Sequence, residues 1–487
     1  MDLKEYIKIT KLSQRLVKKN INRFTISNNF LIPVKEHPSY LQSYSDLNYY
    51  KSSFLLIKYF LFTFFDFIFF LISFLKNIFN KKNVHKKKST NKKILIISHL
   101  LNENMIFKKR DFYFGDLEKN LKKKNLTHHK IYINHLKRDS IFLNKNFNER
   151  DKITVIQNYV NFFEEIDLIY KQFKYFLKFL KLSILEKSFQ NKKFIFRAAV
   201  EFFNLHTKKN YRYSILISTF LIKYNPEKII TTFEGFPWEK IVYKTAKIYN
   251  KKIRCIGYQH AGLTKYQNII KEKFNHGYDP DIIWVTGKNV KKILKKKKTS
   301  IIGSNKVKEY KIKKLKTKKF NCLVVPEGIL SECKKMFQFS IDCASSLPHI
   351  NFIWRLHPTL SFEKILMQLT FKNKLPKNII ISKNQNIDDD VSRSKLCLYR
   401  GSSAVYNALS CGIYSIYLNL NEKISIDTSN GLKCWKKQIN NKAQFINFIN
   451  NLYKMEIKKK KDKKIAIHYS KNYFEKFNIN KAIDCMR

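Results

Sequence analysis

The chain has 487 residues, enough for roughly two or three domains, and its 44% content of hydrophobic residues excludes a disordered polypeptide. Its 95 Lys and Arg residues against 37 Asp and Glu residues give a formal net charge of +58. Such a charge favours polyanionic neighbours such as nucleic acid, anionic lipid headgroups or nucleotides. A high Lys content is also typical of compositional drift in an AT-rich genome, so the charge alone does not identify a partner.

The eight cysteines form no CxxC pair, and several lie inside apolar segments. This pattern predicts reduced, buried thiols in a cytosolic protein rather than a disulfide framework or a zinc site. Residues 1–20 are polar and charged, so we expect no cleavable signal peptide there.

Residues 1–91 form an N-terminal extension that contains one very apolar block, Phe54–Leu75. Its length suits a bilayer span, but Lys58 and Asp66 lie inside it. Three placements remain open: a helix in the membrane interface, a span, or a buried helix. The basic linker that follows, Lys81–Lys93, suits contact with anionic lipid.

Residues 92–305 alternate between apolar runs and helical patterns, which predicts an α/β domain. Pro237 is expected to open a helix that runs to Tyr249. The stretches 152–189 and 194–223 are predicted to be mostly helical. The predicted strands are Ile94–Ser98, Lys130–His135, Lys228–Thr232, Lys252–Tyr258, Asp281–Thr286 and Ser300–Gly303.

A Lys-rich linker at 306–318 precedes a second α/β unit at 319–450, and residues 451–487 are predicted to form a basic helical tail. Repeated βα units of this spacing imply parallel sheets. We therefore expect two doubly wound domains that face each other across a cleft. The predicted strands of the second unit are Asn321–Val325, Asn351–Arg355, Ile379–Ser382, Leu396–Tyr399 and Ile413–Leu418.

Two loops in the first unit carry candidate chemistry, because each follows an apolar strand. Glu234 is placed for general-base work and Gly235 leaves room for a substrate, although a Glu that caps the next helix is an equally good interpretation. Gln259 and His260 follow the next strand, where they would contact an acceptor, assist the base or make ordinary loop hydrogen bonds.

The second unit offers a phosphate seat. Gly401, Ser402 and Ser403 form a turn between a strand and a short helix, where free backbone N–H groups and two hydroxyls suit a phosphate. The alternative is a tight turn with an N-cap serine. Arg400 precedes this turn and pairs either with the phosphate or with a neighbouring acid.

Three further positions accompany this seat. The imidazole of His357 is placed to donate to a phosphate oxygen, with Pro358 fixing its loop and Arg355 either adding charge or only capping the sheet. Gly328 belongs to the loop after the first strand of this unit. The acids at 388–390 resemble a metal cluster, but at a helix start they are better explained by the helix dipole. The sequence contains no GxxxxGK[ST], GxGxxG or HExxH motif.

The order Glu-Gly, Gln-His, His-Pro and Ser-Ser across two βα units resembles bacterial surface-carbohydrate glycosyltransferases of the GT-B type. The most similar are capsule and lipopolysaccharide biosynthesis proteins related to polysialyltransferases and β-Kdo transferases, over residues 92–450. The resemblance implies two Rossmann-like domains. It implies Glu234 as the base, and His357 with Ser402 and Ser403 as ligands of the donor phosphate. Phe233 departs from the family, which has an acid there, and Ala261 lengthens a Gln-His-Gly pattern.

The function that this resemblance implies is inverting, metal-independent transfer of a sugar from a nucleotide donor, with CMP-activated acidic sugars as the first expectation and no further cofactor. The expected partners are a glycan or lipid-linked acceptor and the anionic inner-membrane surface, with no specific nucleic acid. The expected location is cytoplasmic and peripheral at the inner membrane, with a single-span anchor as the other possibility. Two alternatives stay open: a nucleotide-sugar 2-epimerase-like enzyme, and a basic nucleic-acid-binding or membrane-scaffolding protein without catalysis.

Overall fold

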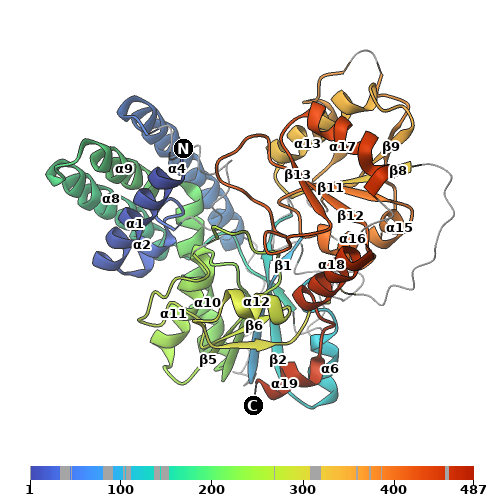
Figure 1. Cartoon of the computed structure of the whole chain (residues 1–487). Coiled ribbons are helices and arrows are strands. Elements are labelled where there is room, and N and C mark those ends of the chain that lie inside the picture. Colours follow the sequence, from blue (N-terminus) through green and yellow to red (C-terminus); the bar gives the residue numbers. More distant parts are fainter. Residues whose placement is uncertain are drawn as a thin grey trace.

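The structure is a computed structural model. It describes residues 2–32, 44, 47–79, 92–101, 105, 111–136, 143, 153–267, 269–305, 307, 320–357, 360–371, 374–384, 386–455 and 460–486. Two parallel sheets form separate layered domains, and a group of N-terminal helices flanks the first domain (Figure 1). All but one residue of the predicted linker at 306–318 lie outside the described residues.

The first sheet has seven parallel strands in the order β3-β2-β1-β4-β5-β6-β7. Its central strands are buried along most of their length, which explains their continuous apolar runs. Chain order reverses between β1 and β4, so this pair is the switch point of a doubly wound sheet. The strands are β1 (Ile94–Leu100), β2 (His128–Asn134), β3 (Ile153–Val155), β4 (Lys228–Thr232), β5 (Arg254–Gln259), β6 (Ile282–Val285) and β7 (Thr299–Ile301).

The second sheet repeats the design with six parallel strands in the order β10-β9-β8-β11-β12-β13. Its switch point lies between β8 and β11. The expected fold of two doubly wound parallel-sheet domains is therefore confirmed. The strands are β8 (Phe320–Pro326), β9 (Ile350–Trp354), β10 (Ile379–Ile381), β11 (Leu396–Arg400), β12 (Tyr414–Leu418) and β13 (Lys436–Ile439).

Helices cover both faces of the sheets. The helices of the first domain include α6 (Leu117–Lys123), α10 (Leu205–Tyr224), α11 (Pro237–Tyr249) and α12 (Lys288–Ile293). Those of the second are α13 (Leu330–Ala344), α14 (Phe362–Leu366), α15 (Ile387–Ser392), α16 (Val405–Ser410) and α17 (Lys442–Met455). Pro237 opens α11 as predicted, since its missing N–H costs nothing at a helix start.

A helical layer joins the N-terminal extension to the first domain. It contains α1 (Leu3–Lys19), α2 (Arg23–Ser27), α4 (Tyr49–Phe79), α8 (Phe162–Leu185), α9 (Phe189–Val200) and the short helix η2 (Glu201–Phe203). Residues of α1 and α2 share one hydrophobic core with α8, α9 and α11. The extension is therefore part of the folded body from its first helix onward.

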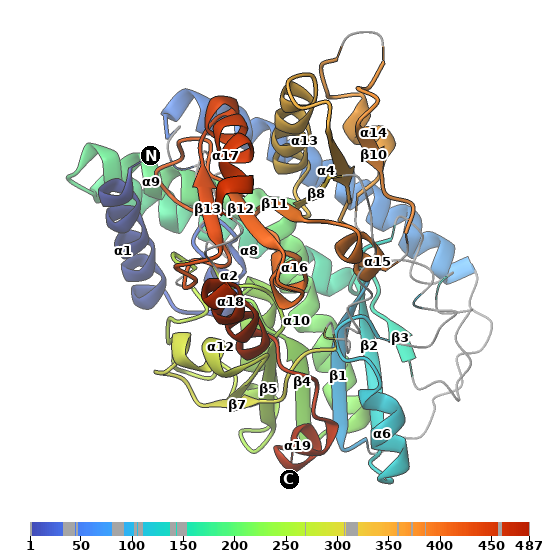
Figure 2. The ribbon, with the colours of Figure 1, turned by 45° about the vertical axis from the view of Figure 1, so that its right-hand side comes forward.

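The chain finally returns from the second domain to the first (Figure 2). Helix α18 (Lys460–Tyr473) packs against α16 of the second domain and α12 of the first, and α19 (Ile479–Asp484) packs against α6. Ser304 and Lys476 form a parallel β-bridge between the two segments. The tail thus ties the two domains together.

Candidate active site

The two switch points place the predicted site residues at the carboxyl ends of the strands. Glu234 and Gly235 follow β4, and Gln259 ends β5 in the first sheet. Gly328 comes shortly after β8, and Gly401 directly after β11 in the second. Ligands of open α/β sheets bind at this edge, beside the point where the strand order reverses.

Glu234 and His260 lie together at the first switch point. Both side chains are about nine-tenths buried, and His260 Nε2 lies 3.9 Å from Glu234 Oε1. The ring of Tyr113 packs against the imidazole of His260, with centroids 4.4 Å apart. Burial, then the charge of Glu234, raises the pKa of Tyr113 above its ordinary range. The sequence predicted the carboxylate and the imidazole, and it gave no signal for this tyrosine.

Glu239 shapes the loop that carries Glu234. Its carboxylate accepts hydrogen bonds from the backbone N–H groups of Glu234, Gly235 and Phe236, the last two at 2.8 Å. The helix cap is therefore Glu239 from inside α11. This arrangement contradicts the alternative in which Glu234 itself caps the helix, and it leaves the Glu234 carboxylate beside His260.

His99 is a site residue that the sequence analysis missed, because it falls one residue beyond the predicted strand Ile94–Ser98. The structure places it on β1, where Nδ1 lies 2.8 Å from His135 Nε2 and Nε2 lies 3.0 Å from Thr232 Oγ1. Its ring also meets Trp238 edge to face. Burial, followed by the neighbouring His135 and His260, lowers the pKa of His99 to about 3, so this imidazole is neutral near pH 7.

The second switch point is built from glycines and a histidine. A Cβ added to Gly328 would lie 2.9 Å from His357 Nδ1, so the imidazole sits directly over the loop after β8. Gly401 has φ +68°, and a Cβ there would lie 2.7 Å from the carboxylate of Glu327. The absent side chains let His357 and Glu327 close in on the two loops. Glu327 belongs to a loop noted in the sequence, but it was not predicted as a site residue.

Ser402 and Ser403 lie where the two domains meet. A Cβ added to Gly262 would lie 3.3 Å from Ser403 Cβ and 3.1 Å from Thr428 Cβ. Thr428 in turn donates to the carbonyl of Ser402 at 3.1 Å. The loop that carries His260 therefore touches the Ser-Ser turn of the other domain.

The two predicted arginines have other partners. The side chain of Arg400 is fully buried and binds Glu332, Glu422 and the carbonyls of Leu418 and Asn419. Burial alone would raise the pKa of Glu332, but Arg400 outweighs it and lowers that pKa to about 2. Arg400 therefore takes the second of its two predicted options, a pairing with neighbouring acids.

Arg355 lies at the end of β9, and its guanidinium contacts Asp390 Oδ2 at 2.7 Å and the carbonyl of Asn384 at 3.0 Å. It links the end of β9 to the start of α15, and its two predicted roles, added charge or a cap of the sheet, stay predictions. Asp390 also accepts from Ser382, Arg393 and Asn384, so it is a hub of side-chain hydrogen bonds.

The remaining predicted residues have varied settings. Gln259 is fully buried and donates to the carbonyl of Ala261, which shapes its own loop. Gly235 has φ +92°, which explains the glycine at that turn. Pro358 lies outside the described residues. No group of three or more His, Cys, Asp or Glu side chains suited to a metal ion occurs within the described part of the chain.

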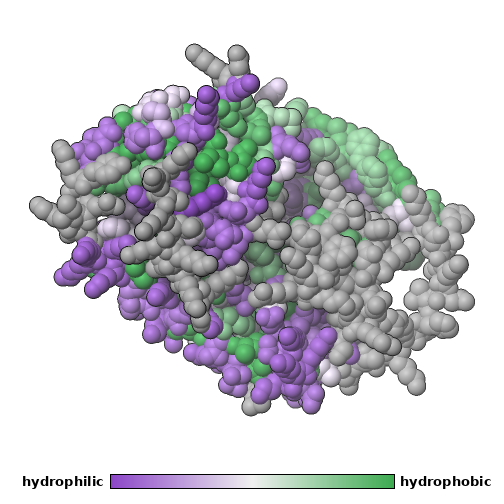
Figure 3. Space-filling model, turned by 90° about the vertical axis from the view of Figure 1, so that its right-hand side faces the viewer, coloured by the Kyte–Doolittle hydropathy of each residue, from purple (hydrophilic) through white to green (hydrophobic). Residues whose placement is uncertain are grey.

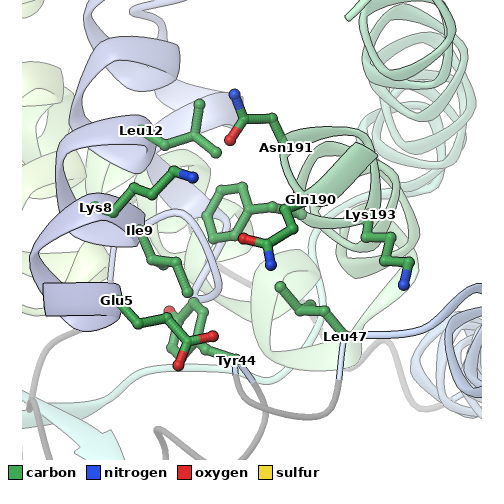
Figure 4. Close-up of a pocket in the computed structure, with 10 residues that line it drawn as sticks. Glu5, Lys8, Ile9, Leu12, Tyr44, Leu47, Gln190, Asn191 and Lys193 are labelled. Carbon is green, nitrogen blue, oxygen red and sulfur yellow. The ribbon is translucent and has the colours of Figure 1, made fainter. Parts of the chain in front are cut away.

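A separate hollow lies in the helical layer, away from these strand ends (Figure 4). It is lined by α1, α9 and residues around Tyr44, with apolar side chains such as Leu12 and Leu47 and charged ones such as Lys8 and Lys193. None of its lining residues belongs to either switch point.

No protein-family profile and no curated protein matches the sequence. Solved structures with a similar chain course include the calicheamicin glycosyltransferase CalG4, at 9% identity over 81% of this chain and 97% of that one, with a TM-score of 0.48. The glycosyltransferase SnogD from Streptomyces nogalater has 11% identity over 82% and 99%, with a TM-score of 0.45. The UDP-GlcNAc 2-epimerase from Neisseria meningitidis bound to UDP-GlcNAc has 12% identity over 81% and 98%, with a TM-score of 0.44. On its own topology, with two doubly wound sheets and a tail that returns to the first domain, the chain has a GT-B-like fold.

Proposed function

We propose that the protein is a glycosyltransferase that moves a sugar from a nucleotide-activated donor to an acceptor hydroxyl. The observation that carries the proposal is the close approach of Gly262 to Ser403, because it brings the loop that carries His260 against the Ser-Ser turn of the other domain. His260 in turn lies beside Glu234. One side thus offers a base, and the other offers hydroxyl and backbone donors. Transfer between two bound substrates needs both.

The proposed reaction is a single displacement with inversion. Glu234 takes the proton of the acceptor hydroxyl, whose oxygen forms a bond to the anomeric carbon as the bond to the nucleotide phosphate breaks. His357, the hydroxyls of Ser402 and Ser403, and N–H groups at the start of α16 stabilise the departing phosphate. These protein donors are proposed to serve in place of a resident metal ion.

The finer identity is also a proposal. A CMP-activated acidic sugar as donor, a glycan or lipid-linked acceptor, and a role in surface polysaccharide synthesis at the cytoplasmic face of the inner membrane rest on the motif order described above. The strand-end positions of these motifs support this assignment.

The first test is thermal stabilisation of the purified protein by CMP, CDP, UDP and GDP. A nucleotide at 100 times its dissociation constant adds about 2.7 kcal/mol to the free energy of unfolding. We expect one nucleotide to stabilise the wild type and to have a much weaker effect on His357→Ala and Ser402→Ala. Equal stabilisation of all three proteins would remove these residues from the site, and no stabilisation by any nucleotide would overturn the proposal.

A nucleotide-sugar 2-epimerase is a second candidate, which the crowding of His99, Tyr113, Glu234 and His260 at one edge favours. Such an enzyme needs several acid and base groups but no acceptor. Release of free nucleotide that depends on an added acceptor supports transfer, whereas isomerisation of the donor sugar without acceptor supports the epimerase.

A further inference from the structure

Helix α4 presents a broad apolar face to the outside. It is long and apolar enough to cross a membrane, yet one side of it is packed on the protein body. Within residues 54–75, its outward aromatic and aliphatic side chains are 44% to 63% exposed. They are Phe54, Ile57, Phe60, Leu61, Phe62, Phe64, Phe65, Phe69, Ile72 and Leu75.

Helix α8 adds a second apolar stripe, which the sequence analysis did not identify. Phe163, Ile166, Tyr170, Phe173, Leu177 and Ile184 recur at intervals of three, four or seven residues, so they share one side of the helix. They are 42% to 83% exposed. The opposite side carries the buried positions Glu165, Leu168, Gln172, Phe179 and Ser183.

The two apolar stripes form one surface. Phe60 of α4 meets Phe173 of α8 edge to face, and Phe74 of α4 meets Phe162 at 5.7 Å between ring centroids. Residues later in α4 therefore contact residues earlier in α8, so the two helices run antiparallel side by side. Figure 3 shows a hydrophobic band along one upper edge of the molecule, toward which α4 extends in Figure 2. We call this surface the α4–α8 face.

Buried ion pairs join the inner sides of both helices to α10. Asp66 of α4 and Glu165 of α8 both pair with Lys208 and Arg212 of α10, with Lys208 Nζ at 2.9 Å and 2.6 Å from the two acids. Burial would raise the pKa of Asp66, but Arg212 and Lys208 outweigh it and hold that pKa below its ordinary value. Withdrawing α4 to cross a bilayer would remove Asp66 and leave the buried Lys208 and Arg212 to share the single carboxylate of Glu165, which is unfavourable.

Basic side chains border the α4–α8 face. Lys174, Lys178 and Lys181 are exposed on α8 next to its apolar stripe, and Lys174 lies over the ring of Tyr170 at 5.9 Å. Lys58 is the one charged side chain among the outward positions of α4 within 54–75, and it lies over Phe62 at 5.6 Å. Aromatic groups beside lysines suit the interface of an anionic bilayer, where rings enter the headgroup layer and ammonium groups meet phosphates.

We propose that the α4–α8 face docks the protein on an anionic lipid bilayer, with both helices lying in the interface and neither crossing it. The occupant is lipid because a broad Phe-rich surface with lysines on and beside it combines apolar burial with attraction to negative headgroups. Of the three placements left open for residues 54–75, this selects the interfacial helix.

The inner side of α4 contacts the segment that follows the carboxyl end of β3, the edge strand of the first sheet. Tyr159, in the segment that follows β3, contacts Phe70 of α4 at 5.8 Å between ring centroids and lies under the guanidinium of Arg212. A docked protein would hold this edge of its first sheet close to the membrane. If the proposed function holds, this position near the membrane implies an acceptor that carries a lipid anchor. This part of the inference therefore rests on the proposed function.

The test is sedimentation of the full-length chain with phosphatidylcholine vesicles and with vesicles that contain phosphatidylglycerol as well. We expect binding to the anionic vesicles that weakens as salt is added. The triple variant Phe163→Gln, Leu177→Gln, Ile184→Gln should bind at least tenfold more weakly. Replacing Lys174, Lys178 and Lys181 by Gln should cost about 10²-fold, since each basic residue near an anionic surface contributes about 1 kcal/mol.

The matched control replaces exposed apolar residues elsewhere, namely Ile248, Met367 and Ile465, by Gln. It should bind vesicles like the wild type. The proposal would be overturned if the control variant lost as much vesicle binding as the apolar α8 variant. It would also be overturned if the wild type bound no vesicles. A wild-type dimer that the α8 variant converts to a monomer, without any vesicle binding, would assign the face to a second copy of the chain.

Extraction of membranes at alkaline pH separates docking from crossing. A docked protein is released into the supernatant, whereas retention in the membrane pellet would show that α4 spans the bilayer and would overturn the proposal. Nucleotide-induced thermal stabilisation is measured on the same variants. It should be unchanged in all of them, so a failure of membrane docking is distinguishable from a failure of the proposed nucleotide site.

Discussion

The two switch points differ in what their side chains can do. The first holds titratable side chains in contact with one another, with His99 against His135 and Glu234 beside His260. The second holds glycines, two hydroxyls, the imidazole of His357 and the buried carboxylate of Glu327, with Gly328 under His357 and Gly401 against Glu327. Buried acids and bases suit proton transfer, while small residues and N–H groups suit close approach to an anion. Under the proposed function, the first switch point therefore supplies the base and the second binds the donor phosphate.

The largest effect should come from breaking the first switch point. Glu234→Gln keeps the size of the side chain but removes the base, so transfer should slow by about 10²–10⁴-fold. Nucleotide-induced stabilisation should remain, because the second domain is untouched. Measuring product formation and nucleotide-induced thermal stabilisation on the same sample checks both expectations. A variant that transfers sugar at the wild-type rate would exclude Glu234 as the base.

A large loss of folding stability is expected when the buried ion pair next to the second switch point is broken. Arg400→Met leaves Glu332 buried without its guanidinium partner, and such a change costs about 3–5 kcal/mol. Chemical denaturation of this variant should show the loss, whereas Lys437→Met at an exposed position should show almost none. If Arg400→Met kept full stability and lost only nucleotide affinity, Arg400 would be a phosphate ligand after all.

A smaller effect should follow from crowding the second switch point. Gly328→Ala places a methyl group 2.9 Å from His357 Nδ1, so the imidazole must move. Nucleotide affinity should fall by roughly tenfold, on the scale of one lost hydrogen bond. If the alanine acts only through His357, the double variant with His357→Ala should bind no more weakly than His357→Ala alone. Additive losses would separate the two positions.

The smallest effect concerns pH. The pKa of His99 is lowered to about 3 by burial, so between that value and its ordinary 6.5 the unfolded chain binds a proton that the folded protein does not. Stability from this group is therefore present above pH 6.5 and is lost as the pH falls. The part between pH 6.5 and 5 should amount to about 1 kcal/mol for a partly accessible imidazole. Denaturation of His99→Asn at pH 7 and pH 5 should show a shallower decline than the wild type.

Buried parallel strands are predictable because they leave long apolar runs. The structure places β4 at Lys228–Thr232, the range expected from sequence, and the predicted strand Leu396–Tyr399 lacks only the last residue of β11. The edge strands β3 and β13 were missed. The first has only three residues, and the second begins Lys-Lys-Gln, so neither shows the pattern of a buried strand.

The candidate site was predictable only where a loop motif marked it. Glu234, His357 and the Ser-Ser turn follow strong strands, and they lie at the switch points. His99 was missed because an imidazole at the end of an apolar run looks like the start of a loop. The role of Arg400 was left between two options, because its acidic partner Glu332 is 68 residues away in sequence.

The return of the tail has a consequence for synthesis on the ribosome. Ile483 and Met486 sit in the same core as Ile94 and Phe114 of the first domain. Ile483 and Met486 are translated only after the whole second domain has been made. Until the tail leaves the ribosome, the core of the first domain therefore lacks the side chains of Ile483 and Met486.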